Sequence, residues 1–335
     1  MRFLFVDRIL QLTPGEVIRG VKHITREDTY LCPDDSNRLC FAPSLIGETL
    51  GQLAAWNVMA FNDFTLRPVA GVVASARLHR SVYIGETLEL ESFIERLDES
   101  AVLYNSVARV GDEVVFNIDG ALGPLLPMTE FIDEKEVRQQ FSEINRPGEW
   151  PVKTTSVNLK NVLERVDNCS TMPTCRGLST ASMDPANKSR DVGLEMTCQQ
   201  TLWDEAARPL PVFSFDRIVA SEPGVSLSAE KRITRAAPYF PDHFPKKPVL
   251  PMTVLLECKL NLAREFIARA PFSIDYTVSE LRKIKMTDFI QPGDIILCDL
   301  KVKEQNEQQL ILNYRSEVNG KRVCILDVVM TARKG

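Results

Sequence analysis

The chain has 335 residues, 44% of them hydrophobic and 25% charged, so it is long enough for two domains, and its composition excludes a disordered, collagen-like or coiled-coil protein. Lys and Arg number 40 against 45 Asp and Glu, and the resulting charge of −5 argues against sequence-independent binding to nucleic acid. The apolar start at residues 1–6 is too short for a signal peptide and no apolar run long enough to span a membrane follows, so we expect a cytoplasmic protein.

The first third of the chain predicts strands around one helix. Residues 7–25 contain two β-rich runs separated by the turn Thr13-Pro14-Gly15, and a polar loop follows them. The apolar stretch from Ser44 to Phe61 predicts a mostly buried helix. Alternation of apolar and polar residues then predicts four strands, over 70–82, 86–97, 101–110 and 113–122.

The rest of the chain divides into an unmatched segment and a second copy of this pattern. Residues 133–144 predict an amphipathic helix, and a polar stretch after Pro147-Gly148 predicts a long connector. The second copy has a predicted helix over 252–268 and strands near 274–286, 295–304, 308–318 and 321–332. The predicted fold class is α+β, with one long helix on an antiparallel sheet, twice over. The expected boundaries are an N-terminal domain at 1–130, a connector at 131–210 and a C-terminal domain at 211–335.

The two copies are related by a nearly constant displacement of 209 residues. Asp7-Arg8-Ile9 recurs as Asp216-Arg217-Ile218, and Pro14-Gly15 recurs as Pro223-Gly224. Further matches are Ile24-Thr25-Arg26 with Ile233-Thr234-Arg235, Tyr30 with Tyr239, Glu48 with Glu257, and Gly111 with Gly320. A displacement that persists over so many pairs indicates an internal duplication.

The cysteines and histidines give no sign of a metal site. The eight cysteines form no CxxC pair, and the three histidines do not stand at zinc-ligand spacing. We therefore expect free thiols and no metal at the cysteines, which are Cys32, Cys40, Cys169, Cys175, Cys198, Cys258, Cys298 and Cys324.

A histidine and a glutamate in the second copy form a candidate base and acid. The proline-rich segment 242–251 places His243 just before the second helix, and its prolines restrict the backbone of the loop. Glu257, fourteen residues further on, stands among leucines, where a carboxyl group is expected to remain protonated. Taken alone, each residue also has a purely structural interpretation.

The string HFPxxPxxP at 243–251, followed by a helix with its acid at Glu257, resembles the β-hydroxyacyl-acyl carrier protein dehydratases of the FabZ and FabA type. Residues 2–9, 76–80, 84–86 and 291–294 resemble other parts of that family. The resemblance covers both copies but not the connector. It implies the hotdog fold, a helix wrapped by a curved antiparallel sheet. Because the family works as a dimer, two tandem hotdogs in one chain would form a fused pseudo-dimer.

The resemblance also implies the parts of each active site. The histidine comes from one hotdog and the carboxylic acid from the other, while a backbone N–H at the start of the central helix binds the thioester carbonyl. In the first copy, Asp34 stands at the position of His243, and Pro43, which has no N–H, stands five residues before Glu48. In the second copy, Met252 stands five residues before Glu257 and keeps the N–H.

One composite site therefore keeps every part. His243 and the Met252 N–H would come from the C-terminal hotdog, and Glu48, oriented by Gln52 as by the family's glutamine, from the N-terminal one. At the second site, Asp34, Pro43 and Glu257 supply neither a suitable base nor a donor, so that site is predicted to be inactive. There Glu257 is expected to face Asp34.

The resemblance predicts dehydration of 3-hydroxyacyl thioesters to trans-2-enoyl thioesters, in fatty-acid or polyketide-like biosynthesis. No cofactor is expected beyond the phosphopantetheine of an acyl carrier protein partner. Four alternatives stay open: hydration of enoyl-CoA, double-bond isomerisation, a hotdog thioesterase and a non-catalytic acyl-binding protein. The acyl chain length and further association between chains also stay open. The carrier is predicted to dock on a basic patch made of Lys246, Lys247, Arg282, Lys283 and Lys285.

Overall fold

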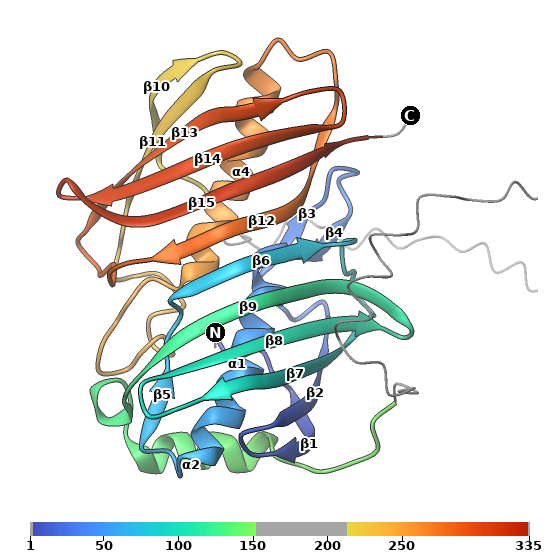
Figure 1. Ribbon diagram of the computed structural model, residues 1–335, viewed down its shortest axis with the longest axis vertical. Coiled ribbons are helices and arrows are strands. Elements are labelled where there is room, and N and C mark those ends of the chain that lie inside the picture. The colour runs from blue at the N-terminus through green and yellow to red at the C-terminus, as the bar shows by residue number, and fades with distance from the viewer. Residues whose placement is uncertain (1–2, 152–212, 334–335) are drawn as a thin grey trace, which may run out of the picture. The chain divides into compact units, whose positions relative to one another are not determined.

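The first half of the chain forms strands around one long helix in the predicted order (Figure 1). The computed structural model describes residues 3–151 and 213–333. The helices of this half are α1 (Pro43–Phe61), the 3₁₀ turn η1 (Met128–Glu130) and α2 (Glu134–Ile144). Its strands are β1 (Arg8–Thr13), β2 (Val17–His23), β3 (Leu31–Pro33), β4 (Leu39–Phe41), β5 (Leu66–Pro68), β6 (Val72–Leu78), β7 (Thr87–Leu97), β8 (Ala101–Val110) and β9 (Glu113–Pro127).

The second half repeats this arrangement around the helix α4 (Met252–Arg269). Its strands are β10 (Arg217–Glu222), β11 (Ser226–Arg232), β12 (Tyr276–Met286), β13 (Ile295–Gln305), β14 (Gln309–Val318) and β15 (Lys321–Ala332). We refer to the two halves as the N-terminal and the C-terminal hotdog.

Both hotdogs contribute to one continuous antiparallel sheet. Its order is β1-β2-β7-β8-β9-β6-β12-β15-β14-β13-β11-β10, with β5 paired to β9 outside this path. The order is symmetric about the central pair of β6 and β12, which are equivalent strands of the two copies. These two strands pair antiparallel, with Ala76 opposite Leu281, so a backbone ladder joins the hotdogs.

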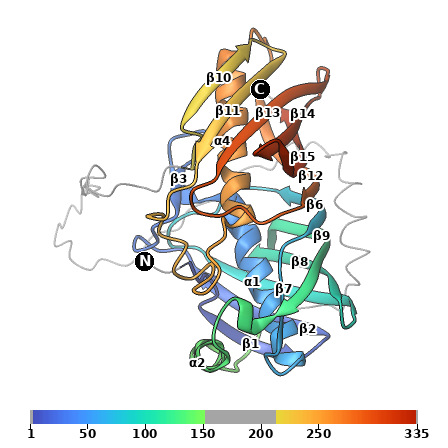
Figure 2. The same cartoon turned by 90° about the vertical axis from the view of Figure 1, so that its left-hand side faces the viewer.

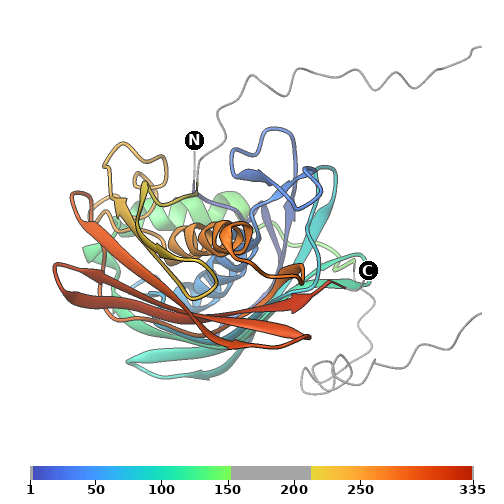
Figure 3. The same ribbon diagram turned by 90° about the horizontal axis from the view of Figure 1, so that it is seen from above.

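The long helices α1 and α4 lie against the concave face of the curved sheet, one on each half, and their first turns meet at the junction (Figures 2 and 3). Leu45, Leu50 and Leu53 of α1 have no exposed surface, and neither have Leu255 and Ala263 of α4. Helices that are apolar on most of their circumference are stable only when buried, which explains why each copy wraps its helix in a sheet. This packing places the starts of both helices inside the molecule, near the junction of the two hotdogs.

The repeated glycines of the sequence occupy equivalent turns. Gly15 and Gly224 follow the first strand of each copy with φ of +79° and +76°, and Gly85 and Gly293 have φ of +94° and +98°. Glycine adopts this left-handed backbone without the steric cost that other residues incur. The glycine matches therefore reflect the same backbone turns in both copies.

Three features of the first half differ from the sequence-based expectation. The loop between β2 and α1 contains the short hairpin of β3 and β4, and β5 precedes β6. The helix predicted over 133–144 is α2, but it packs against the N-terminal hotdog: Phe141 contacts Trp56 and Phe64, with ring centroids 5.8 and 5.2 Å apart. The first residues assigned to the connector thus belong to the packing of the first hotdog, whereas most of the connector lies outside the described residues.

Cys32, Cys40, Cys258, Cys298 and Cys324 are free thiols, and the other three cysteines lie outside the described residues. Within residues 3–151 and 213–333, no group of three or more His, Cys, Asp and Glu side chains is arranged to hold a metal ion. Of the helices in the described part of the chain, none combines the length and the apolar character needed to cross a membrane.

Candidate active site

His243 is held by the loop that precedes α4. Its Nδ1 lies 2.9 Å from the carbonyl oxygen of Val249, which can only accept a hydrogen bond, so we assign the ring proton to Nδ1. Nε2 is then left with a free lone pair. The N-terminal hotdog reaches this loop, because the backbone N–H of Phe3 donates to Asp242 at 2.6 Å and the ring of Phe3 meets that of His243 edge-on. The imidazole is therefore fixed in one tautomer and one orientation.

Burial lowers the pKa of His243 below its ordinary value, although the carboxylate of Glu48 and the Val249 carbonyl act in the opposite direction. The charge of Arg67 adds to the lowering. At neutral pH the ring is thus neutral, the form that a proton acceptor requires.

Glu48 is held by groups from both hotdogs. Gln52, one turn further along α1, donates from Nε2 to Oε1 of Glu48 at 3.0 Å. Thr253, the second residue of α4, donates from its hydroxyl to Oε2 at 2.6 Å. Gln52 is itself fixed by the backbone of the N-terminal segment, since it accepts from Phe5 N at 2.9 Å. The carboxyl group of Glu48 therefore points out of α1 toward the start of α4.

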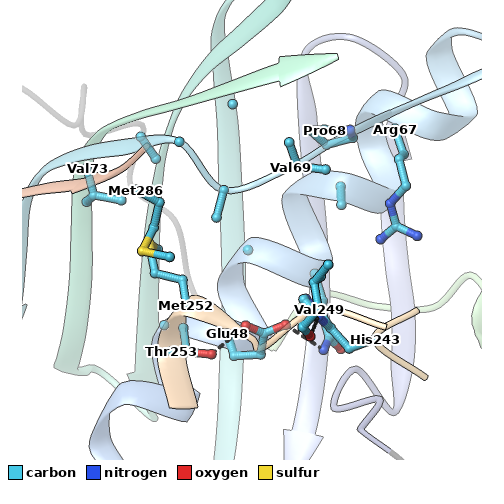
Figure 4. Close-up of a pocket in the computed structure, with 18 of the residues that line it drawn as sticks. Glu48, Arg67, Pro68, Val69, Val73, His243, Val249, Met252, Thr253 and Met286 are labelled. Atoms are coloured by element: carbon cyan, nitrogen blue, oxygen red, sulfur yellow. Dashed lines mark hydrogen bonds between the residues drawn. The ribbon is translucent and has the colours of Figure 1, made fainter. Parts of the chain in front are cut away.

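Figure 4 shows Glu48 and His243 on the wall of one cavity, which has a volume of about 400 Å³. Most of its other lining is apolar and comes from both hotdogs, for example from Trp56, Met59, Val69, Val73, Ile132 and Leu256. Such a combination of a largely apolar wall and a few convergent polar groups is typical of a small-molecule site.

The start of α4 adds a hydrogen-bond donor to this cavity. Met252 lines the cavity and is the first residue of α4, directly after Pro251. Its backbone N–H has no hydrogen-bond partner among the described residues. The first N–H groups of a helix carry partial positive charge and suit an oxygen on which negative charge develops.

The equivalent position of the other hotdog has no such donor. Pro43 is the first residue of α1, and the next N–H, that of Ser44, already donates to Oε2 of Glu257 at 2.9 Å. The hollow beside Pro43 and Ser44 measures about 10 Å³, which is too small for a substrate.

Asp34 and Glu257 do not form the facing pair that the sequence suggested. Asp34 closes the tip of the β3–β4 hairpin, where it accepts from the N–H groups of Ser36 and Arg38 at 2.9 Å and from the hydroxyl of Tyr83 at 2.8 Å. Glu257 is fully buried, and its charged neighbour is Arg264, whose Nη1 lies 3.8 Å from Oε1. The expectation that Glu257 faces Asp34 is therefore corrected: it overlooked Arg264, which stands about two turns further along α4.

The five residues of the expected basic patch fall into two groups. Lys246 and Lys247 form ion pairs with Asp133 and Glu130, and Arg282 pairs with Glu280 at 2.6 Å. Lys283 and Lys285 of β12 are exposed and have no ion-pair partner among the described residues. Only these two of the five are free to attract an acidic partner.

Two residues of the site, Thr253 and Arg67, could not be identified from any pattern in the sequence. Thr253 follows Met252 in the helix, and its contact with Glu48 exists only because the two hotdogs pack together. Arg67 of β5 lines the cavity, with its guanidinium carbon 3.9 Å from the centre of the Phe244 ring. A single arginine in a three-residue strand matches no motif, so only the fold identifies it.

Comparisons with known proteins indicate the family of the chain. The sequence profile of the ApeI-like dehydratases matches residues 220–325. The 3-hydroxyacyl-[acyl-carrier-protein] dehydratase FabZ of Nitrosospira multiformis is 31% identical over 131 residues, which make up 37% of this chain and 88% of that protein. FabZ of Shewanella baltica is 28% identical over 131 residues, with 37% and 84% coverage.

Solved structures resemble the chain over nearly its full length. A MaoC-like dehydratase matches with a TM-score of 0.51 and 12% identity, covering 96% of this chain and 98% of that one. The tesB protein of Mycobacterium avium subsp. paratuberculosis also has a TM-score of 0.51, with 9% identity and coverage of 97% and 96%. At such low identity these matches bear on the fold alone. The chain thus belongs to the FabZ-type family of 3-hydroxyacyl-[acyl-carrier-protein] dehydratases and folds as two tandem hotdogs.

Proposed function

We propose that the chain dehydrates 3-hydroxyacyl thioesters, carried on an acyl carrier protein, to trans-2-enoyl thioesters. The main support for this proposal is that His243 and Glu48, which come from different hotdogs, line one cavity beside the N–H of Met252, which has no partner among the described residues. The reaction breaks a C–H bond and a C–O bond on adjacent carbons, and these three groups meet the two demands that follow from this.

The first demand is removal of the proton on C2. Nε2 of His243 accepts this proton, since Nδ1 is occupied by its hydrogen bond to Val249. Negative charge then develops on the thioester oxygen, which the N–H of Met252 stabilises at the start of α4.

The second demand is departure of the hydroxyl group on C3. Glu48 delivers a proton to this oxygen as the C3–O bond breaks, so that water leaves and the C2–C3 double bond forms. Thr253 and Gln52 hold the carboxyl group in the required direction. Both steps are proton transfers, so the proposed reaction needs no metal or redox cofactor, and the phosphopantetheine arrives with the substrate.

A direct assay distinguishes this proposal from its rivals. We mix the purified full-length chain with 3-hydroxybutyryl-pantetheine and follow the products by NMR. We expect the signals of a trans-2-enoyl thioester and water. Free pantetheine thiol would indicate a thioesterase, and an unchanged substrate that nevertheless binds would indicate an acyl-binding protein. Either of these results would overturn the proposal.

The pH profile should reveal a histidine with a lowered pKa. Because burial disfavours the imidazolium form of His243, the ring stays neutral to a lower pH than a free imidazole, whose pKa is ~6.5. We therefore expect kcat/KM to remain at its plateau at that pH and to fall only in more acidic buffer. If kcat/KM on the acidic side of the profile were already half-maximal at a pH above the pKa of free imidazole, a group other than His243 would be titrating.

The docking of the carrier should depend on β12. Lys285 is exposed and precedes Met286, which lines the cavity, so Lys285→Glu should weaken binding of an acidic carrier. We expect KM for a carrier-bound substrate to rise about 3- to 10-fold at low salt, and KM for the pantetheine thioester to stay unchanged. Lys301→Glu on β13 makes the same charge change away from the cavity and serves as the control. Equal effects of the two variants would reject docking at this strand.

A further inference from the structure

Arg67 is a cation on the cavity wall without an anionic partner. Its Nε is inaccessible to solvent and has no hydrogen-bond partner, and none of its nitrogens forms an ion pair among the described residues. Its guanidinium stacks on Phe244, the residue that follows His243. Burial lowers the pKa of Arg67 to about 10, which leaves the group charged at neutral pH. Arg67 is only partly buried, and its contact with the Phe244 ring does not neutralise its charge, so a positive charge remains on the cavity wall.

The groups that could neutralise Arg67 are engaged elsewhere. Glu48 is the carboxyl group whose charge acts on Arg67, but both of its oxygens accept hydrogen bonds, from Gln52 and Thr253. In the proposed reaction Glu48 also carries a proton and then has no charge to offer. The guanidinium is therefore available to a group that enters the cavity.

The geometry limits which part of a substrate can reach Arg67. The ring of Phe244 lies 4.0 Å from that of His243, and the guanidinium carbon of Arg67 lies 3.9 Å from the ring of Phe244. The guanidinium is thus no more than about 8 Å from the imidazole that acts on C2. The phosphate of phosphopantetheine is separated from the thioester by the whole length of the pantetheine arm. Arg67 can therefore meet only the acyl group or the first part of that arm.

We propose that Arg67 binds a carboxylate on the acyl chain, so that the preferred substrates are monothioesters of 3-hydroxy dicarboxylic acids. This inference rests on the proposed function. A full negative charge fits an unpaired guanidinium better than a neutral amide of the pantetheine arm does, because a charge-assisted and bidentate contact is the stronger one. The mostly apolar lining of the cavity lowers the local dielectric constant, which strengthens such a contact.

The test compares two substrates that differ in charge at the end of the chain. We measure kcat/KM for the pantetheine thioesters of 3-hydroxyadipic acid and 3-hydroxyhexanoic acid. For the unchanged protein we expect kcat/KM to favour the carboxylate substrate by about 10- to 100-fold. Arg67→Gln should abolish this preference, and Arg67→Lys, which keeps the charge but not the fork of donors, should retain part of it.

The matched control is Arg138→Gln, which removes a partly exposed arginine of α2 that does not line the cavity and should leave the preference intact. Equal kcat/KM values for the two substrates in the unchanged protein would overturn the inference. A loss of activity in Arg67→Gln that is equal for both substrates would assign Arg67 to the pantetheine arm and overturn it as well.

A binding measurement separates this inference from the proposed function. If neither substrate is dehydrated, the proposed function fails. Calorimetric titration with the unreactive thioesters adipyl-pantetheine and hexanoyl-pantetheine then tests whether Arg67 binds the carboxylate of the acyl chain. We then expect a Kd about 10-fold lower for adipyl-pantetheine, and loss of that difference in Arg67→Gln. Equal Kd values in the unchanged protein would contradict the inference whatever the catalytic result.

Discussion

His243→Ala and Glu48→Gln are each expected to lower kcat for a 3-hydroxyacyl thioester by about 10²- to 10⁴-fold, the contribution of a positioned base or acid. His243→Ala removes the proton acceptor, and Glu48→Gln keeps the shape of the side chain but removes its transferable proton. Gln52 and Thr253 can still hydrogen-bond the amide of the variant, so the fold around α1 should persist. Steady-state kinetics of each variant test the expected loss of kcat, and thermal unfolding tests whether the fold persists.

The equivalent residues of the other hotdog provide the control. Glu257 is fully buried against Ser44 and Arg264 and does not line the cavity of His243 and Glu48, and Asp34 closes a hairpin. We expect Glu257→Gln and Asp34→Asn to change kcat by less than about 10-fold, because neither group meets the substrate. If Glu257→Gln were inactive and Glu48→Gln active, the acid would come from the same hotdog as His243, and the composite site would be wrong.

Met252→Pro is expected to lower kcat by about 10²- to 10³-fold, the usual effect of losing one oxyanion donor. The change removes the backbone N–H at the start of α4 and leaves the base and the acid in place. Proline is well tolerated as the first residue of a helix, and Pro43 already holds this position in α1. Pro251 has φ −58° and ψ 133°, close to the −54° and 123° of Ala42 before Pro43, so the backbone before residue 252 is already suited to a following proline.

Met252→Ala separates the backbone effect from the side chain. It shortens the side chain on the cavity wall but keeps the N–H, so we expect kcat to stay within about 10-fold of the unchanged protein. If the alanine variant lost as much activity as the proline variant, the side chain of Met252 would matter and not its N–H.

Local patterns were enough to predict the repeated framework. The helix predicted from Ser44 begins at Pro43, and the strand predicted over 86–97 is Thr87–Leu97, because alternation and turn residues act within a few positions of the chain. The displacement between the copies predicted that α1 and α4 are equivalent, and the symmetric strand order reflects that equivalence.

Contacts between distant segments could not be predicted in this way. The hairpin of β3 and β4 has strands of only three residues, one of which contains Pro33, so it has no clear strand pattern. Thr253 and Arg67 join the site because one hotdog packs on the other, and no spacing in the sequence encodes that packing. Arg264 beside Glu257 was missed for a different reason: the residues next to Glu257 in the sequence are apolar, whereas the arginine stands about two turns further along the same helix.

The central claim is that a single site is assembled from both hotdogs of one chain. A crystal structure of the full-length chain with an acyl carrier crosslinked to the cavity through its pantetheine arm tests it most directly. We expect the acyl carbonyl oxygen about 3 Å from the N–H of Met252, with C2 facing Nε2 of His243 and C3 facing Glu48. An acyl group bound beside Glu257 and Asp34, or one whose carbonyl oxygen points away from the start of α4, would show that the site is not a composite of the two hotdogs.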